Sequence, residues 1–397
     1  MNLLDSIQSF LESTGVAQMF ADGWVGALKT LIMFVIAGVL VYLALARGFE
    51  PLLLLPIAIG VLLTNIPGIS LFHSEWYMVS GQINYVEILN HGELLDILYI
   101  GVKTGFYPCM IFIGIGAMTD FTPLISNPKS LLIGAGAQFG VFVAFSGALL
   151  SMLFTPEEAA SIGIIGGADG PTAIYVTKTL APALLGAIAI AAYSYMALIP
   201  MIQPPIMRLM TTEKERKIKM SDLRPVTKLE KILFPLLVTL IVGLVVPSAL
   251  SLIGCLMFGN ILNVCGVTDR LSKTVQNGLM NAITVCLGIS VGATAKASSF
   301  LDLKTLGIIA LGLVAFCIST FGGLLTAKIM CKLTGGKINP LIGSAGVSAV
   351  PMAARVAQKE GQKADPSNFL LMHAMGPNVA GVIGSAVAAG VLLACFA

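Results

Sequence analysis

An isolated acidic residue in an apolar, glycine-rich stretch is the clearest sign of chemistry in this sequence. Asp169 lies within GIIGGADGPT, residues 163–172, and a carboxylate in apolar surroundings is costly unless it is paired or coordinated. The glycines can leave carbonyl groups outside a helix, and Pro171 can begin a new one. Together with the hydroxyl of Thr172, these hard oxygen ligands favour an alkali cation or an exchanging proton. The alternative is an aspartate that caps a short surface helix.

A second interrupted stretch, residues 339–358, contains two predicted helix starts. Asn339 precedes a proline, which is typical of an N-cap followed by the first helical residue, and Pro351 predicts another start. Mostly small residues and hydroxyls lie between them, so another backbone could approach closely. Arg355 follows in the second half-helix, where its guanidinium suits a carboxylate ligand through two parallel hydrogen bonds. Alternatively, Arg355 extends to water from a helix end.

Other polar residues in apolar stretches are weaker candidates. Asn378 follows a proline inside the last apolar stretch, and its amide could bind a cation or satisfy a carbonyl group. Tyr193 and Tyr195 follow in the stretch after Asp169, and either could hydrogen-bond to the site or lie at a membrane interface. A proton relay could use one of three further residues, although each is more often interfacial or satisfied: Lys103, Lys178 and His373.

The composition places these residues in a membrane protein. Of the 397 residues, 56% are hydrophobic and only 11% are charged, whereas soluble domains have roughly 25% charged residues. This excess of apolar residues predicts an all-α polytopic membrane protein. The 42 glycines and 19 prolines favour a transporter with broken helices over simple membrane anchors.

The sequence also argues against several classes of protein. A net charge of +3 is too small for a nucleic-acid binder. The seven cysteines lie singly in apolar stretches, so neither a disulfide framework nor a zinc site is expected. Phosphate-binding loops, dinucleotide fingerprints and nucleophile triads are missing from the sequence. Lys219 lacks the surroundings of a biotin-attachment lysine, so we expect no covalently bound cofactor.

Hydropathy predicts about ten or eleven transmembrane helices, with two broken segments at 160–180 and 339–358. The bounded spans are 29–46, 51–66, 97–118, 130–154, 183–205, 232–249, 251–267, 278–294, 305–330 and 368–396. Before them, acidic residues and a helical apolar spacing predict an amphipathic surface helix instead of a cleavable signal peptide. The residues concerned are Leu3, Leu4, Asp5, Ile7, Phe10, Leu11 and Glu12.

The loops predict an orientation. Residues 208–231 contain eight lysines and arginines, so the positive-inside rule places this basic loop in the cytoplasm. The loop could determine only the orientation of the chain in the membrane, or it could also bind a partner protein. Residues 51–102 contain no lysine or arginine, and we expect this stretch to be external.

A weak internal repeat relates the two halves of the chain. Gly116 aligns with Gly292 and Gly167 aligns with Gly343, each at an offset of 176 residues. The flanking loops have opposite charge polarity, which favours an inverted repeat with a site between its halves; chance similarity among glycine- and alanine-rich helices is the alternative. The predicted division is an N-terminal amphipathic segment 1–28, N-terminal helices and external loop 29–96, first repeat 97–207, basic loop 208–231, connecting helices 232–277 and second repeat 278–397.

Three long motifs resemble a known family. They are GGADGPTAIYVTKTLAP at 166–182, NPLIGSAGVSAVPMAARVAQ at 339–358 and MHAMGPNVAGVIGSAVAAG at 372–390. All three are similar to the β subunit of the sodium-translocating biotin-dependent decarboxylases, which act on oxaloacetate, methylmalonyl-CoA or glutaconyl-CoA. The resemblance covers nearly all of the chain and is strongest from 97 to 397.

The resemblance implies a subunit of a bacterial cytoplasmic (inner) membrane pump. Such a subunit decarboxylates carboxybiotin and couples CO2 release and consumption of one proton to Na+ export. The carboxybiotin comes from a separate biotin carrier protein, charged by a carboxyltransferase α subunit, and a small γ/δ membrane subunit accompanies them. The family also suggests a homotrimer with inverted repeats. The choice of acid is expected to lie on the carboxyltransferase.

The resemblance also implies roles for residues of this sequence. The family's ion-site aspartate matches Asp169, and its tyrosine further along the chain matches Tyr195. The implied catalytic residues are Asp169, Tyr195 and Arg355. The implied Na+ ligands are Asp169, Asn339, Gly343, Ser348 and Asn378, and the implied carboxybiotin contacts are Asn339, Ser348 and Arg355.

These roles give a hypothesis with two competitors. Asp169 and Ser348 would hold Na+, Arg355 would steer the carboxylate of carboxybiotin, and an external proton would replace Na+ and be used as the carbamate breaks. A Na+-coupled secondary transporter of a small carboxylate would show the same broken helices. A membrane scaffold for a carboxyltransferase would tolerate changes at Asp169 or Arg355.

Overall fold

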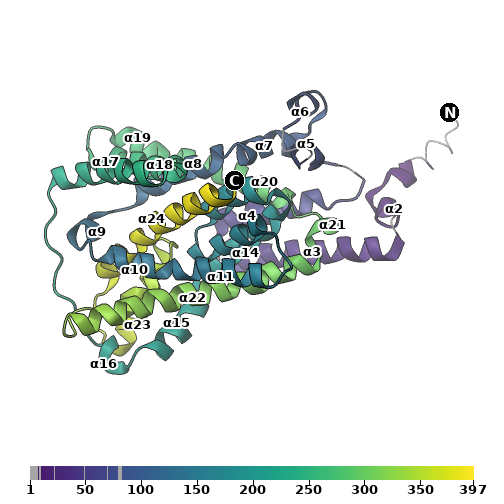
Figure 1. Cartoon of the computed structure of the whole chain (residues 1–397). Helices are drawn as coiled ribbons and strands as arrows, with labels where there is room; N and C mark the ends of the chain where they lie inside the picture. The colour runs from purple at the N-terminus through teal and green to yellow at the C-terminus, as the bar shows by residue number, and fades with distance from the viewer. Residues whose placement is uncertain (1–7, 9, 22, 49, 69, 79–82) are drawn as a thin grey trace.

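The chain folds into an elongated bundle of helices (Figure 1). The computed structural model describes residues 8, 10–21, 23–48, 50–68, 70–78 and 83–397. These residues form helices and loops without strands, and six to eight of the helical spans are long and apolar enough to cross a membrane, which confirms the predicted all-α polytopic class. Helices α3 (Gly23–Ala46), α17 (Lys228–Val245) and α22 (Leu303–Leu333) run along the long axis of the bundle.

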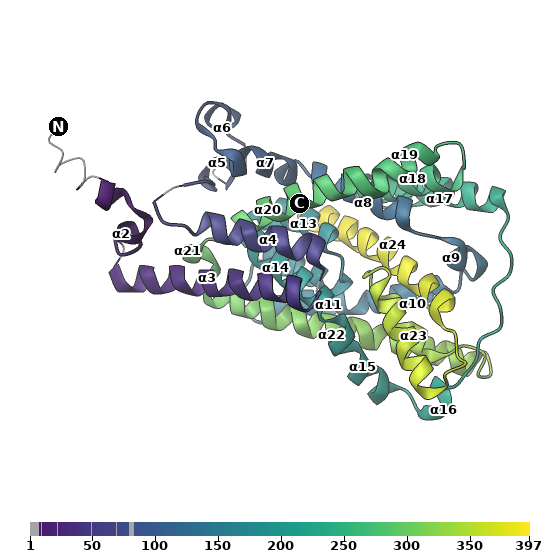
Figure 2. The same cartoon turned by 180° about the vertical axis from the view of Figure 1, so that it is seen from behind.

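The basic loop lies at one end of the bundle. One end, called the basic end below, contains α16 (Glu213–Arg216) and the loop that leads to α17. The opposite end, called the far end, contains α2 (Gly15–Met19) and α21 (Ala297–Phe300). Figure 2 shows the same separation from behind. The basic residues of 208–231 therefore gather at one end of the bundle.

The remaining helices complete the bundle. From the N-terminus they are α4 (Pro51–Thr64), α5 (Glu75–Met78), α6 (Tyr85–His91), α7 (Leu94–Lys103), α8 (Phe106–Met118), α9 (Thr122–Ser126), α10 (Ser130–Ala137), α11 (Phe139–Leu150), α12 (Pro156–Gly163), η2 (Ile164–Gly167), α13 (Gly170–Leu180), η3 (Pro182–Leu184), α14 (Leu185–Ala197) and α15 (Ile199–Met210). After α17 they are η4 (Pro247–Ala249), α18 (Leu250–Val264), α19 (Asp269–Thr274), η5 (Val275–Leu279), α20 (Met280–Ala293), η6 (Pro340–Gly346), α23 (Met352–Ala364) and α24 (Leu371–Phe396).

Fewer helices are long and apolar enough to cross a membrane than the sequence predicted. Among the described residues there are six, or eight if the bent pairs α7–α8 and α14–α15 each count as one span. Two predicted spans account for the difference from ten. Helix α4 has 14 residues, whereas a perpendicular crossing needs about 20. Helix α17 begins with Lys228, Glu230 and Lys231, which makes its first turn polar.

Both segments predicted to be broken are interrupted in the structure. In the first hairpin, α12 and η2 enter the bundle and α13 leaves it, with Asp169 between η2 and α13. In the second hairpin, η6 enters and α23 leaves, and residues 347–351 lie between them. The structure thus gives each half of the chain one hairpin.

The two hairpins enter from opposite ends of α22. Lys304, in the first turn of α22, binds Glu158 of the first hairpin at 2.8 Å. Lys328, near the other end of α22, donates to the carbonyl of Met210 at the basic end at 2.8 Å. Asn339, which begins the second hairpin, donates to the carbonyl of Arg216 at that same end. Because 31 helical residues span about 46 Å, the hairpins approach each other through the interior of the bundle.

The N-terminal prediction is tested only in part. Leu3, Leu4, Asp5 and Ile7 lie outside the described residues. Phe10 and Leu11 are exposed, and α2 covers Gly15–Met19. Helix α3 begins at Gly23, six residues before the predicted first span, so part of the segment 1–28 belongs to a long apolar helix.

Candidate functional site

The tips of the two hairpins meet inside the bundle. Ala168 has a left-handed backbone conformation with φ of 55°, which ends η2. Asp169 is then extended and becomes the N-cap of α13. The backbone N–H of Ser348, in the second hairpin, donates to the carbonyl of Gly167 at 3.0 Å. One backbone hydrogen bond therefore joins the two interrupted segments beside Asp169.

Three structural elements surround the carboxylate of Asp169. Its Oδ2 atom lies 3.0 Å from the hydroxyl of Ser385 in α24 and 3.2 Å from the hydroxyl of Ser348. Its Oδ1 atom accepts the backbone N–H of Thr172 at 3.3 Å. Asp169 is 5% exposed, and none of the ion pairs formed by the described residues includes it. The carboxylate is thus buried among hydroxyls without an arginine or lysine partner.

The side chains around Asp169 offer oxygen ligands. The hydroxyl of Thr172 is buried and has no hydrogen-bond partner among the described residues. Hydroxyls can turn their lone pairs towards a cation, and one carboxylate with several neutral oxygens suits a monovalent ion. The part of the chain described contains no group of three or more His, Cys, Asp and Glu side chains that could hold a metal. The arrangement therefore offers the oxygen ligands that suit a hard monovalent cation, and a carboxylate that can bind a proton.

Ser385 is a site residue that the sequence did not identify. It lies in the apolar helix α24, and its hydroxyl is also 3.1 Å from the carbonyl of Val382 one turn earlier. Helical serines commonly bond to such carbonyls, so nothing in the sequence distinguishes Ser385 from an ordinary helical serine. Its contacts with Asp169 and with Ser348, at 3.4 Å, come only from the packing of α24 against both hairpins.

Asn378 fixes the second hairpin from the neighbouring helix. Its amide nitrogen donates to the carbonyls of Ala345 at 3.0 Å and Val347 at 2.8 Å. Its amide oxygen is buried and has no partner among the described residues. The structure thus places Asn378 against the backbone that leads to Ser348, with one oxygen still available to a ligand.

Gly343 provides a close approach between the second hairpin and α22. A Cβ atom at Gly343 would lie 2.4 Å from the carbonyl oxygen of Gly323, and a Cβ at Gly323 would lie 2.2 Å from the carbonyl oxygen of Gly343. Real Cβ contacts are essentially never so short. Gly343 is therefore needed for packing, and it lies five residues before Ser348.

Asn339 lies at the entrance of the second hairpin. Its amide nitrogen donates to the carbonyls of Arg216 and Ile218 at 3.0 and 2.8 Å, and its oxygen accepts the N–H of Leu341 at 3.0 Å. These contacts occupy both ends of the amide. The structure places Asn339 with the basic loop and gives it no contact with Asp169.

Arg355 is also separate from the cluster around Asp169. It lies in the first turn of α23, seven residues after Ser348, and its side chain is exposed. Among the described residues it forms no ion pair. Its guanidinium is therefore accessible to an incoming anion, in the same hairpin as Ser348.

The two tyrosines of α14 face different neighbours. The hydroxyl of Tyr195 donates to the carbonyl of Ile309 in α22. Tyr193 is fully buried and its ring packs on Gly170, where a Cβ atom would lie 2.8 Å from the tyrosine hydroxyl. That hydroxyl has no hydrogen-bond partner among the described residues. Tyr193 is thus beside the residue that follows Asp169, whereas Tyr195 is bonded to α22.

The remaining relay candidates lie apart from this cluster. The ammonium of Lys178 donates to the carbonyl of Lys103 at 3.3 Å and lies 5.0 Å from the centre of the Tyr175 ring. The Nδ1 atom of His373 is buried without a partner among the described residues. The structure gives none of the three a contact with Asp169.

A charged cavity of about 260 Å³ lies at the basic end. Glu360 binds Arg208 through two hydrogen bonds of 2.9 and 3.1 Å and Lys363 at 2.5 Å. Burial alone would raise the pKa of Glu360, but the hydrogen bonds from Arg208 and Lys363 outweigh it and lower that pKa below its ordinary value. The lining residues are Arg208, Glu213, Arg216, Glu360, Lys363 and Ala364.

Comparison with known sequences identifies relatives along the whole chain. A family model described as the Na+-transporting oxaloacetate decarboxylase beta subunit matches residues 29–396. The methylmalonyl-CoA decarboxylase subunit beta of Propionigenium modestum is 57% identical over 401 residues, which cover 99% of this chain and 100% of the relative.

Two further relatives act on different substrates. The glutaconyl-CoA decarboxylase subunit beta of Acidaminococcus fermentans is 57% identical over 91% of this chain and 92% of its own length. The oxaloacetate decarboxylase beta chain of Klebsiella pneumoniae is 49% identical over 98% of this chain and 99% of its own. With a family match from 29 to 396 and relatives of this similarity, the chain belongs to the family of Na+-transporting decarboxylase beta subunits.

Proposed function

We propose that this chain decarboxylates carboxybiotin and couples the reaction to Na+ export, with Asp169 as the ion-binding carboxylate. The main support is the position of Asp169, which lies buried among the hydroxyls of Ser348 and Ser385 where two hairpins from opposite ends of the bundle meet. A site at such a meeting point can open to one side or the other when the hairpins move. Family membership supplies the reaction and the coupling ion.

In the Na+-bound state, Asp169 supplies the charge and the hydroxyls supply neutral oxygens. In the structure, the hydroxyls of Ser348 and Ser385 donate to this carboxylate. When Na+ enters, rotation of each hydroxyl turns an oxygen lone pair towards the ion. The same hydroxyls can thus bind either the carboxylate or the cation. The amide oxygen of Asn378 and the hydroxyl of Thr172 are further oxygens that the ion could recruit.

Carboxybiotin reaches the protein at the basic end. Arg355 attracts its carboxylate through a bidentate contact, and Asn339 holds the entrance of the second hairpin against the basic loop. The reaction cleaves the bond between the biotin nitrogen and the carboxyl carbon, releases CO2 and places a proton on that nitrogen. Asp169 supplies this proton after it has exchanged Na+ for a proton from the far end.

The two tyrosines of α14 assist at different points. The hydroxyl of Tyr193 lies beside Gly170 and has no hydrogen-bond partner among the described residues; in this proposal it donates to Asp169 when Na+ has left. Tyr195 connects α14 to α22 through the carbonyl of Ile309. We assign Tyr195 a positioning role in the catalytic cycle, because this bond links the helix beside the first hairpin to the helix that both hairpins contact.

Two inverted repeats, 97–207 and 278–397, account for the architecture. Gly116 of α8 packs against α18, and its repeat partner Gly292 of α20 packs against α4; added Cβ atoms would lie 1.8 and 2.1 Å from carbonyl oxygens of those helices. Each repeat thus packs against the helix that precedes the other repeat. If α4 and α17 are counted as short or tilted spans, the chain crosses the membrane ten times. The segments 29–96 and 232–277 precede the first and the second repeat and correspond to each other.

The basic loop 208–231 faces the cytoplasm in this proposal. The partners are a carboxyltransferase α subunit, a biotin carrier protein and a small γ/δ membrane subunit, and three copies of this chain form a homotrimer in the bacterial cytoplasmic membrane. Carboxybiotin remains attached to the carrier, so Na+ and carboxybiotin are substrates of this chain.

Uptake of ²²Na+ by inverted membrane vesicles that contain the whole complex tests the proposal. Oxaloacetate, methylmalonyl-CoA or glutaconyl-CoA is added in turn, and CO2 release is recorded together with ²²Na+. One of the three compounds should drive both CO2 release and ²²Na+ uptake. An avidin blot should detect a biotinylated chain in the purified complex. Accumulation of a carboxylate without CO2 release or biotin would instead identify a secondary transporter.

A further inference from the structure

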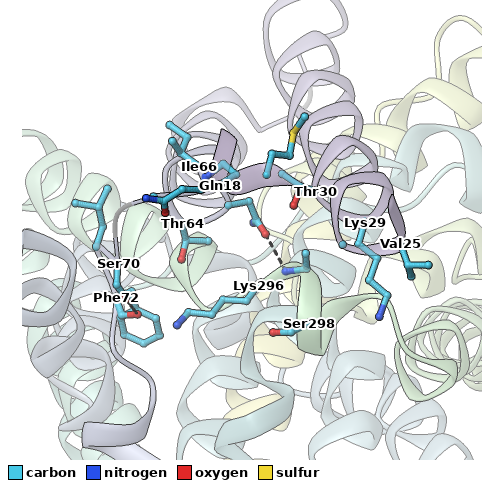
Figure 3. Close-up of a pocket in the computed structure, with 17 residues that line it drawn as sticks. Gln18, Val25, Lys29, Thr30, Thr64, Ile66, Ser70, Phe72, Lys296 and Ser298 are labelled. Atoms are coloured by element: carbon cyan, nitrogen blue, oxygen red, sulfur yellow. Dashed lines mark hydrogen bonds between the residues drawn. The ribbon is translucent and has the colours of Figure 1, made fainter. Parts of the chain in front are cut away.

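A second cavity lies at the far end, away from Asp169. Its volume is about 670 Å³, and Figure 3 shows side chains from the start of α3, the loop after α4 and the segment before α21 around it. Among its described lining residues the charged ones are Lys29 and Lys296. Hydroxyls of Thr30, Thr64, Ser70 and Ser298 also line the cavity. The lining is therefore cationic and rich in hydrogen-bond donors.

The floor of the cavity is held by a buried amide. Asn65 is 8% exposed, and its nitrogen donates to the carbonyls of Val61 and Ala295, each at 2.8 Å. Its oxygen accepts the N–H of Ala297 at 2.8 Å. These bonds tie the end of α4 to the turn that includes Lys296. The cavity is thus preformed by long-range contacts.

Lys29 lies near the start of α3. It is the sole charged residue in α3, whose mean hydropathy reaches 2.4 over its most apolar 18 residues. Only 22% of those residues are buried in the protein, so the rest of the chain leaves most of α3 uncovered. A lysine in such a helix is stable where its ammonium reaches the headgroup layer or an anion.

Two aromatic residues lie just before this lysine in the sequence. Trp24 is 82% exposed, and its ring packs edge-on against Phe20 at 5.2 Å. Exposed tryptophans gather at the level of lipid headgroups. Lys29 is five residues further along α3, about 7.5 Å along the axis, which is within reach of headgroup phosphates for a side chain of its length.

We propose that this cavity binds the phosphate of an anionic phospholipid in the leaflet at the far end. Lys29 and Lys296 contact the phosphate, the hydroxyls around them donate hydrogen bonds to its oxygens, and an acyl chain lies on the exposed apolar face of α3. Val35 and Val39, which are 65% and 49% exposed, belong to that face. The bound lipid bridges α3 and the turn before α21.

The test compares lipid retention by purified variants. Wild-type protein and a Lys29→Met, Lys296→Met double variant are purified in a mild detergent, and co-purifying phospholipid is quantified by mass spectrometry. Loss of both charge-assisted contacts should lower retained phosphatidylglycerol about tenfold. Lys273→Met, at an exposed lysine of α19 at the basic end, should retain the wild-type amount. Lys29→Arg, Lys296→Arg keeps both charges and should also retain the lipid.

Competition in nanodiscs separates a lipid site from a free-anion site. Delipidated protein is placed in phosphatidylcholine nanodiscs, and phosphatidylglycerol or inorganic phosphate is added. Saturable binding of phosphatidylglycerol that inorganic phosphate fails to displace supports the proposal. Equal lipid retention by the methionine variant, with wild-type elution and thermal stability, would overturn it, and so would displacement by inorganic phosphate at equal concentration.

Discussion

The backbone N–H of Ser348 donates to the carbonyl of Gly167, 3.0 Å away, and so joins the two hairpins at the position of Asp169. Ser348 contributes its hydroxyl to the same carboxylate. One residue of the second hairpin thus contacts both the backbone and the acid of the first. Any motion that exposes Asp169 to one side of the membrane must break these bonds or move both tips together.

Replacement of Asp169 by asparagine should abolish Na+-dependent decarboxylation and leave the complex assembled. The amide keeps the size of the side chain but lacks the charge that a cation or proton needs. Decarboxylation by the purified complex, measured against Na+ concentration, checks this. Asp120→Asn changes an exposed acid and should behave as wild type. Turnover by Asp169→Asn with unaltered Na+ dependence would remove Asp169 from the mechanism.

The serines should share the binding of Na+ with Asp169. Ser348→Ala and Ser385→Ala each remove one neutral oxygen, worth about 1 kcal/mol, so each should raise the half-saturating Na+ concentration about fivefold. Because both hydroxyls contact the same carboxylate oxygen, the double variant should deviate from additivity. Ser126→Ala, whose hydroxyl bonds to the basic loop, is the matched control. Unchanged Na+ affinity in both single variants would contradict the proposed ion site.

The sequence predicted the two hairpins because their breaks are local. Glycine and proline around Asp169, and two prolines around Ser348, determine where helices end and begin. The partners of Asp169 depend instead on packing. Ser385 belongs to an uninterrupted helix, and its relation to Asp169 follows from the position of α24. Similarly, the resemblance implies that Asn339 is a ligand. Its hydrogen bonds in the structure go to the basic loop instead, and they depend on residues that are distant in the sequence.

The neighbours of Tyr193 and Tyr195 also could not be predicted from the sequence. Tyr193 and Tyr195 are two residues apart, so they lie on nearly opposite faces of a helix, and the sequence alone does not say which face meets the site. In the structure Tyr193 packs on Gly170 and Tyr195 bonds to Ile309. The span count was also affected by packing, because α4 and α17 are stabilised in the bundle without being long apolar helices.

Phenylalanine substitutions should separate the two tyrosines. Tyr193→Phe removes a hydroxyl without a described partner, so thermal stability should be kept while turnover falls and becomes more dependent on external pH. Tyr195→Phe removes the bond to Ile309 and should lower the free energy of unfolding by about 1 kcal/mol. Melting temperature and decarboxylation rate are measured for both. Full stability with lost turnover in Tyr195→Phe would move the proton role to Tyr195.

An alanine at Gly343 should destabilise the protein. Its Cβ would lie 2.4 Å from the carbonyl oxygen of Gly323, and relief of such overlap typically costs about 1–3 kcal/mol. The melting temperature in detergent should fall accordingly. Gly254→Ala is the control, since a Cβ there meets no atom within 4 Å and alanine favours a helix. A wild-type melting temperature for Gly343→Ala would disprove the tight packing of the second hairpin on α22.

Glu360 should make stability depend on pH in the acidic range. Its pKa is lower in the folded protein than its ordinary value, so its ion pairs stabilise the fold fully above that ordinary value. This contribution is lost as the pH falls through the lowered folded pKa. Melting curves of wild type and Glu360→Gln should therefore converge as the pH falls. Asp222→Asn, in the exposed basic loop, should show the same dependence of melting temperature on pH as the wild type. If the melting temperatures of wild type and Glu360→Gln differed by the same amount at all pH values, the proposed role of Glu360 would be wrong.

Protection of Asp169 from a hydrophobic carbodiimide tests the central claim most directly. The reagent modifies protonated carboxyl groups in apolar surroundings, and peptide mass spectrometry locates the modified residue. We expect the reagent to modify Asp169. We expect Na+ to slow this modification in proportion to the fraction of sites that it occupies, whereas choline at the same ionic strength should have no effect. Modification of Asp169 at the same rate with and without Na+ would show that the ion does not bind at this carboxylate.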